Sequence, residues 1–593
     1  ASARPPGRTL TRLRIGILHS SPVPAMPLVG FLQSSFLLRS PPQNSNAFLR
    51  SHPPRRAHLS PRTLPLAQLP ANSDPSQSPP PSDPAAPILE SPDASARTAT
   101  LEHPAPASAG AAKKQAPAQV RERAWEALDR LLAEKRVEFK ARVRKPGDRT
   151  IDPVGDLYPA DTKDEAIRLF GHEEREIRVN FFRDPDYWCP DCQAVQLQLE
   201  AKGIPYRIRL INMRDKGKQA AYFLRLRDTG ILPTIQLDLS SVVQEAGKVR
   251  AAIEAQFPDY YPLLPPKRTE ELEDAKRIFE VERVLYRAWF GFLFRSEKDW
   301  PQGQERFVEA LKKWTQILVQ QGGGGPFVLG EEMSLLDVYA APLFERYIAS
   351  ALYFKGFKIR GDPAYAPVHQ WLLAMERQFP QYAATTPDYY SIVRDIPIHY
   401  GQPLPSELGT PFQKFIDGDD QHWELPLPPL NSSAIEPRGS LRPGDQGDHG
   451  RHRVEASGHI LTNMKNMTIM LTNRALRVTS TGRQKRQIIA PFQINEEISV
   501  QLDEALRLLS RALLVGVDEL EPERLEGYPL PRQIGDPIVV AFCAMRNSVR
   551  VPRDMSFPAA RQFRAHVSWV CQVIVGSERW AVLKNKLRPK KVE

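Results

Sequence analysis

The sequence predicts a mixed α/β domain, then an all-helical domain, then a further, mainly helical domain, with a disordered tail in front of them. Strand and helix patterns alternate in the order βαβαββα over about 85 residues from Ile177. From Thr269 to about Arg377 every segment has the periodicity of a helix, and helical periodicity returns near Ala456. A chain of 593 residues is long enough for two to four such domains.

Proline and positive charge are concentrated at the N-terminal end of the chain. Residues 1–120 hold 22 of the 57 prolines and carry 12 Lys and Arg against five Asp and Glu. Because most of the net charge of +11 therefore lies in the tail, no nucleic-acid partner is expected for the folded body. The sequence has no run of 18 apolar residues, so no transmembrane segment is expected.

The first 73 residues contain nine Arg and no Lys, Asp or Glu. A leader that is rich in Arg and Ser and lacks acids is typical of an organelle transit peptide. A disordered tail without a targeting role is the alternative, and a secretory signal is less favoured because Pro22, Pro24 and Pro27 interrupt the most apolar stretch. Residues 74–118 have the Pro-, Ala- and Ser-rich composition of a disordered linker.

Shifts in composition and periodicity predict six segments. We expect a disordered transit peptide and linker over 1–118, a helical lead-in over 119–174, an α/β domain over 175–262, an all-helical domain over 263–395, a Pro/Gly-rich linker over 396–455 and a mainly helical extension over 456–593. The lead-in is predicted from Trp125, Leu128 and Leu132, which recur at helical intervals among charged residues.

The α/β domain is predicted to contain four strands and three helices. Apolar and aromatic residues alternate in the strands, and Gly203 ends the first helix because glycine is the usual residue just past a helix end. The expected strands are 177–182, 206–212, one opening at 230–235, and 241–244; the expected helices are one that opens at the Cys-x-x-Cys motif, with Pro190 in its first turn, and ends near Gly203, followed by 218–227 and 245–256.

Helix-start signals mark the remaining domains. Ser334 and Asp337 have the spacing of a capping box, in which the purpose of the carboxylate is structural. In the extension, Asp536-Pro537 and Ser556-Phe557-Pro558 each predict a helix start, with the proline in the first turn.

Two of the four cysteines, Cys189 and Cys192, are three residues apart, after a predicted strand and at the start of a helix. Unpaired N–H groups at a helix N-terminus favour a thiolate, and Cys192 lies one turn further on, where it can resolve a mixed disulfide. Half of a zinc site is the competing interpretation, but neither Cys543 and Cys571 nor the histidines supply a second ligand pair at zinc spacing. The sequence therefore favours a redox pair without a metal.

Two further features accompany the cysteines. Leu232-Pro233 opens a strand some 40 residues beyond the pair, a combination that marks the thioredoxin-like fold, in which this proline is cis and faces the cysteine. Glu245 then stands at the turn into the last helix of the domain. The N–H groups of such a helix start and a carboxylate can together hold both ends of a small zwitterion.

With these motifs the chain resembles a cysteine-type glutathione transferase over about residues 175–395. The resemblance rests on Trp188-Cys189-Pro190-Asp191-Cys192, Ile231-Leu232-Pro233-Thr234-Ile235, Glu245-Ala246, Gly325-Pro326-Phe327-Val328-Leu329-Gly330 and Ser334-Leu335-Leu336-Asp337. The Cys-Pro-x-Cys site and the long C-terminal extension, with its stretch Val551-Pro552-Arg553-Asp554-Met555-Ser556, are most similar to the iota class of photosynthetic organisms.

The resemblance implies a site for glutathione as co-substrate. It makes Cys189 the nucleophile with Cys192 as its partner, and places Trp188, Pro190, Lys216, Leu232, Pro233, Glu245 and Ala246 at the glutathione site. Two residues depart from the family pattern. Ala246 stands where the family usually has a hydrogen-bonding Ser, and the Asp191 carboxylate opposes thiolate formation at Cys189.

The leading hypothesis is a glutathione-dependent thiol transferase or reductase that acts on an oxidised or electrophilic small molecule or on a glutathionylated protein. A non-catalytic ligand carrier or assembly subunit, with the extension as its partner surface, is the alternative, and a thioredoxin-type reductase without glutathione is a third. The intact cysteine pair favours the enzyme, and the helical domain favours glutathione dependence. A homodimer is possible in this family. The iota resemblance points to a plastid, with the mitochondrion as the alternative.

We predict that residues 1–73 behind a start methionine carry a fused fluorescent protein into the plastid of a plant cell. The physical reason is the acid-free, Arg-rich composition that import receptors recognise. A fusion in which the nine arginines are replaced by glutamine serves as the control and should stay in the cytosol. Secretion or cytosolic retention of the unaltered fusion would reject the targeting prediction.

Overall fold

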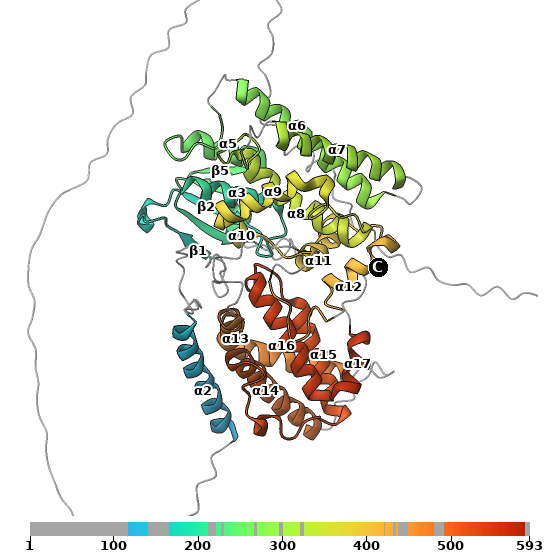
Figure 1. Ribbon diagram of the computed structural model, residues 1–593. Coiled ribbons are helices and arrows are strands. Elements are labelled where there is room, and N and C mark those ends of the chain that lie inside the picture. Colours follow the sequence, from blue (N-terminus) through green and yellow to red (C-terminus); the bar gives the residue numbers. More distant parts are fainter. Residues whose placement is uncertain are drawn as a thin grey trace, which may run out of the picture. The chain divides into compact units, whose positions relative to one another are not determined.

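The computed structural model of the chain is shown in Figure 1. It describes residues 117–139, 165–211, 221–226, 230–265, 270–295, 300–320, 325–419, 421–430, 435–436, 449–479 and 492–587. The predicted transit peptide and most of its linker lie outside these residues, as does Lys216.

A five-stranded mixed sheet is the centre of the α/β domain, with the order β1-β3-β2-β4-β5. The strands are β1 Glu165–Arg168, β2 Val179–Arg183, β3 Tyr206–Leu210, β4 Thr234–Leu237 and β5 Ser241–Gln244. β2 and β3 are parallel, and the other pairs are antiparallel. The four predicted strands are present within a few residues of their expected bounds. β1 was not predicted, because four residues that begin and end with a charge carry no clear alternation.

Three helices complete this domain: α3 Pro190–Lys202, α4 Ala221–Leu226 and α5 Ala246–Gln256. α3 packs against α5, against the core of the sheet and against α8 of the helical domain, which is why nearly all its side chains are buried. Gly203 adopts a left-handed conformation with φ 69° just past α3 and so ends the helix where predicted. The Leu232–Pro233 peptide bond is cis, as expected.

The second domain is helical throughout, as predicted. Its helices are α6 Glu270–Phe294, α7 Trp300–Gln320, α8 Leu335–Lys355, α9 Ala366–Gln378, α10 Pro380–Thr385, α11 Tyr389–Tyr400 and α12 Thr410–Ile416. The capping box at the start of α8 is confirmed: the Asp337 carboxylate accepts from the Ser334 N–H at 2.9 Å and from the Trp371 indole N–H at 2.8 Å. The buried α8 runs through the core of this domain.

The extension is a bundle of α13 His449–Thr479, α14 Phe492–Val515, α15 Arg532–Ser548, α16 Phe557–Val575 and α17 Ser577–Lys586. A further helix, α2 Pro117–Glu138, packs against α13 and α14 (Figure 1). It buries Trp125, Leu128 and Leu132 in the core of this bundle, and the Trp125 indole N–H donates to Asp503 at 3.0 Å. None of the helices in the described ranges combines the length and apolar character needed to cross a bilayer.

These contacts correct three expectations. The predicted lead-in over 119–174 is divided, since α2 belongs to the bundle of the extension and β1 to the sheet. The predicted linker over 396–455 holds the end of α11, α12 and the first turns of α13, and it buries Trp423 and Leu430. α15 starts before Asp536, because the Pro531 carbonyl accepts from the Gly535 N–H at 2.8 Å, so that Pro537 lies inside the helix.

We predict that truncation at Pro117 leaves the melting temperature unchanged, whereas truncation after Phe139 lowers it by several degrees. The second truncation removes α2 and exposes the groove on α13 and α14 that Trp125, Leu128 and Leu132 fill. Burial of each such side chain contributes about 1.5–3 kcal/mol. Calorimetry on the two truncated proteins measures the difference, and equal melting temperatures would show that α2 does not contribute to the bundle.

Candidate active site

The two cysteines lie at the start of α3. Cys189 is the N-cap residue, Pro190 occupies the first turn, and the Cys192 N–H donates to the Cys189 sulfur at 3.3 Å. Both are free thiols. Both residues are buried; Cys189 retains 8% of its residue surface and Cys192 none, so Cys189 is the less enclosed of the two.

The surroundings make the two thiols unequal. Burial, together with the neighbouring Cys189 sulfur, raises the pKa of Cys192 well above its usual range. A buried carboxylate, Asp184, lies beside the pair, and its oxygen and the two sulfurs are all within 4.8 Å of one another. Burial likewise raises the pKa of Asp184. The arrangement gives Cys192 a nearby group that can take its proton.

This triplet is also a set of metal-binding groups in the described part of the chain. It offers one carboxylate oxygen and two sulfurs. A structural zinc site uses four ligands, and the triplet supplies three. The triplet therefore falls one ligand short of such a site.

A buried arginine supplies positive charge behind the cysteines. The Arg183 guanidinium stacks on the Tyr187 ring at 3.4 Å, donates to the Gln196 side chain and lies 3.7 Å from the Asp184 carboxylate. The charge of Asp184 is thereby balanced inside the protein. The sequence did not identify Arg183 as a site residue, because an arginine at the end of a strand is usually exposed.

The Asp191 carboxylate, which the sequence suggested would oppose a thiolate, has a partner. Its oxygen lies 3.3 Å from the Arg250 guanidinium of α5, which also covers the Tyr339 ring at 4.4 Å. This cation offsets the negative charge of Asp191. The departure at this position is therefore compensated within the chain.

The end of α11 covers the cysteine loop. The His399 and Trp188 rings are stacked with their centroids 3.3 Å apart, and the Tyr400 ring meets Trp188 edge-on at 6.1 Å. Burial raises the pKa of the Tyr400 hydroxyl, and the negative charge of an ionised Cys189 sulfur raises it further. Neither α11 residue could be identified from the sequence, because they lie some 200 residues beyond the motif and carry no pattern of their own.

A second residue that the sequence did not indicate, Arg346 of α8, holds the loop from the helical domain. It donates to the Tyr187 carbonyl at 2.8 Å and to the Trp188 carbonyl at 3.1 Å. It also donates to the Gln193 side chain at 2.6 Å and to the Glu345 carboxylate at 2.9 Å. This one buried guanidinium therefore fixes the loop, α3 and α8 relative to one another.

Two of the predicted glutathione-site residues, Trp188 and Leu232, lie at the cysteines, and Glu245 and Ala246 lie at the start of α5. Trp188 and Leu232 pack against the core cluster that contains Cys189 and Cys192. Glu245 is the N-cap residue of α5 and has φ 71°, a strained conformation that costs about 1–3 kcal/mol and is concentrated at functional sites. Its carboxylate accepts from Lys248 at 2.8 Å, and Ala246 is buried behind it.

The comparisons match this two-domain body. Residues 188–256 match the family model described as Glutathione S-transferase, N-terminal domain, and residues 280–374 match Glutathione S-transferase, C-terminal domain. Both domains are thus glutathione S-transferase-like. The predicted combination of a thioredoxin-like domain with this helical domain is confirmed.

Individual proteins are similar to a part of the chain. It is 27% identical over 166 residues to Glutathione S-transferase DHAR3, chloroplastic, of Arabidopsis thaliana, and 28% identical over 166 residues to Probable glutathione S-transferase DHAR2, chloroplastic, of Oryza sativa subsp. japonica. Each match covers 28% of this chain, and the chain spans 57% and 54% of these relatives. The crystal structure of Chlamydomonas reinhardtii dehydroascorbate reductase aligns over 38% of this chain and 99% of its own, with 19% identity and a TM-score of 0.32.

A buried acid, Glu282 of α6, stands close to this site. It accepts a hydrogen bond from the Tyr347 hydroxyl at 2.7 Å, and the negative charge of Asp191 repels its ionised form. Burial raises its pKa to about 7. The folded protein therefore keeps Glu282 protonated at mildly acidic pH, where an unfolded chain ionises it.

We predict that Glu282→Gln makes the protein more resistant to urea at about pH 8 but not at about pH 4.5. Between about pH 4.5 and 7 the folded state holds a proton that the unfolded state releases, so wild-type stability falls as the pH rises through this window. The glutamine side chain of the variant does not ionise, so the variant avoids this pH-dependent loss of stability, which is worth up to about 3 kcal/mol. Its amide oxygen can still accept the hydrogen bond from the Tyr347 hydroxyl. Glu280→Gln on the exposed face of α6 is the control. If Glu282→Gln increased the resistance to urea equally at both pH values, the raised pKa of Glu282 would be contradicted.

Proposed function

We propose that the protein is a glutathione-dependent thiol transferase or reductase with Cys189 as the nucleophile. The observation that supports this most is the inequality of the pair: Cys189 is the N-cap residue of α3 and keeps 8% of its surface, whereas Cys192 is fully buried with a raised pKa beside Asp184. The similarity of both domains to glutathione S-transferases supports the co-substrate.

Glutathione is proposed to lie along the edge formed by the cis Leu232–Pro233 bond and the start of α5. The Leu232 backbone pairs with the cysteinyl part, and the Glu245 carboxylate and the N–H groups of the α5 start hold the γ-glutamyl end. Lys216, outside the described residues, is the proposed partner of the glycyl carboxylate. Trp188 and Pro190 shape the site around the sulfur. Ala246 offers no hydroxyl, which removes one hydrogen bond worth about 1 kcal/mol.

The first chemical step is an exchange between a thiolate and a disulfide. The Cys189 thiolate attacks the glutathione sulfur of a glutathionylated substrate, the substrate sulfur leaves as a thiolate, and a disulfide between Cys189 and glutathione remains. No external oxidant or reductant is consumed, since one disulfide is exchanged for another. The N–H groups at the start of α3 stabilise the attacking thiolate.

The second step releases the Cys189 sulfur by one of two routes. A second glutathione thiolate can attack the mixed disulfide, which yields oxidised glutathione and the Cys189 thiolate. Alternatively, Cys192 passes its proton to the Asp184 carboxylate and attacks Cys189, which releases glutathione and leaves an internal disulfide that two further glutathione molecules reduce. The two sulfur atoms lie within 4.8 Å of each other, a distance that supports this second route.

The finer classification and the site of action are also proposals. The Cys-Pro-x-Cys motif with a helical extension supports membership of the iota class, and the plastid relatives support a plastid location. A reducing stroma keeps both cysteines as thiols, ready for exchange.

We predict that oxidised glutathione adds one glutathione to Cys192→Ser and none to Cys189→Ser at this site. Without Cys192 the mixed disulfide at Cys189 cannot be resolved internally, so it accumulates. Intact-mass analysis and peptide mapping of the full chain measure the adduct. Cys571→Ser, a buried cysteine of the extension, is the matched control and should behave as the wild type.

Two results would overturn this assignment. An adduct on Cys192 with turnover of a glutathionylated peptide retained in Cys189→Ser would move the nucleophile to the other sulfur. No adduct on either residue would remove the enzyme and leave the ligand carrier as the better hypothesis.

A further inference from the structure

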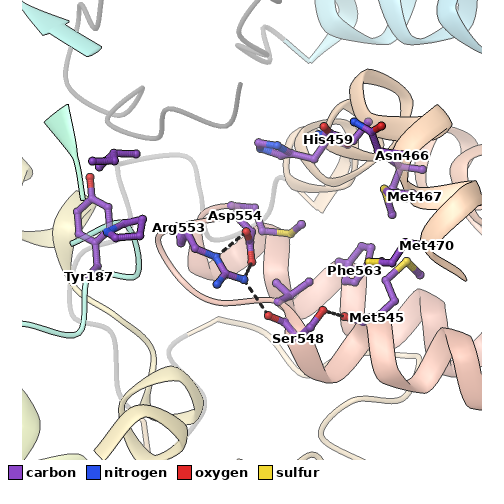
Figure 2. Close-up of a pocket in the computed structure, with 16 residues that line it drawn as sticks. Tyr187, His459, Asn466, Met467, Met470, Met545, Ser548, Arg553, Asp554 and Phe563 are labelled. Atoms are coloured by element: carbon purple, nitrogen blue, oxygen red, sulfur yellow. Dashed lines mark hydrogen bonds and ion pairs between the residues drawn. The ribbon is translucent and has the colours of Figure 1, made fainter. Parts of the chain in front are cut away.

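A cavity of about 450 Å³ lies between the loop that precedes the cysteines and the helical extension. Tyr187 forms one side, and side chains of α13, α15 and α16 form the other (Figure 2). Neither Cys189 nor Cys192 lines it. The volume falls within the range of pockets for small organic molecules, about 300–1,000 Å³.

The walls of this cavity are mainly apolar and adaptable. Four methionines line it, together with Tyr187 and Phe563; they are Met467, Met470, Met545 and Met555. Methionine side chains are flexible and polarisable, and their sulfur atoms make favourable contacts with aromatic rings. Such a wall suits a flat aromatic ligand more than a compact aliphatic one.

Two polar groups of α13, the His459 ring and the Asn466 amide, line the same cavity (Figure 2). Among the described residues neither side chain has a hydrogen-bond partner, and His459 is only half-buried. Both are therefore available to a ligand that presents a carbonyl or hydroxyl edge.

The charged groups of the cavity, by contrast, are already paired. Arg553 donates to the Asp554 carboxylate at 2.7 and 2.8 Å and to the Asp186 carboxylate at 2.7 Å. It also donates to the Ser548 carbonyl at 3.0 Å. One cation thus faces two carboxylates, which leaves no positive charge for an anionic ligand such as glutathione.

We propose that this cavity is a second ligand site, for a neutral, planar aromatic molecule with a hydrogen-bonding edge. The aromatic part lies among the methionines, and the edge meets His459 and Asn466. This site differs from the proposed glutathione site in two ways. Neither cysteine lines it, and it suits a neutral ligand instead of an anionic one. It shares Tyr187 with the loop that leads to Cys189, so its occupant touches the backbone segment that carries the nucleophile.

The test uses the full chain and the neutral dye Nile red, whose fluorescence rises in an apolar site. We expect saturable binding that Met470→Trp weakens at least tenfold, because Met470 lines the cavity with half of its surface exposed, and the larger side chain obstructs the opening. Ile469→Trp is the matched control: Ile469 is the adjacent residue on α13, is exposed and does not line the cavity. Its affinity for the dye should equal that of the wild type.

Asn466→Trp, one turn before Met470 and exposed, provides a second test at the same face and should also weaken binding. S-hexylglutathione at saturation should leave the dye bound. Displacement by S-hexylglutathione would place the dye at the thiol site, and equal affinity in Met470→Trp and Ile469→Trp would place it outside this cavity; either result overturns the proposal. If oxidised glutathione failed to add to Cys189, the binding of Nile red to the cavity would be unaffected. The proposed thiol chemistry and the proposed second ligand site can therefore be rejected independently of each other.

Discussion

The geometry at the cysteines depends on one buried guanidinium, that of Arg346. It joins the helical domain to the carbonyls of Tyr187 and Trp188, which belong to the loop that delivers Cys189 to the start of α3. Loss of this side chain would leave the Glu345 carboxylate buried without its cation, which typically costs about 3–5 kcal/mol. The loop is therefore held from two domains: within the α/β domain the Trp188 N–H donates to the Asp184 carboxylate at 3.1 Å, and Arg346 adds the contacts from the helical domain.

The extension reaches the same loop from another side. The Arg564–Asp388 pair is buried at 2.6 Å, and the Val551 N–H donates to Ser391 at 2.9 Å, so the start of α11 is held by the extension. The other end of α11 carries His399, which stacks on Trp188. One helix thus links the third domain to the residue next to the nucleophile, which gives the extension a structural part in the thiol site.

Local chemistry was predictable, and long-range contacts were not. The start of α3 at Pro190, its end at Gly203 and the capping box of Ser334 follow from residues within a few positions of one another. The place of α2 in the bundle of the extension depends on a partner 378 residues away, and the roles of Arg346 and His399 depend on domain packing. Single-sequence periodicity contains no information on such pairings.

The division of labour between the two thiols is tested most directly by alkylation with iodoacetamide across a pH series, with peptide mapping of the full chain. The account predicts that Cys189 is labelled first at every pH, and that Cys192 reacts only in strongly alkaline solution, because burial raises its pKa. In urea both should react at similar rates, which shows that the folded structure causes the difference. Faster labelling of Cys192 in the folded protein, or equal rates for the two, would contradict the account.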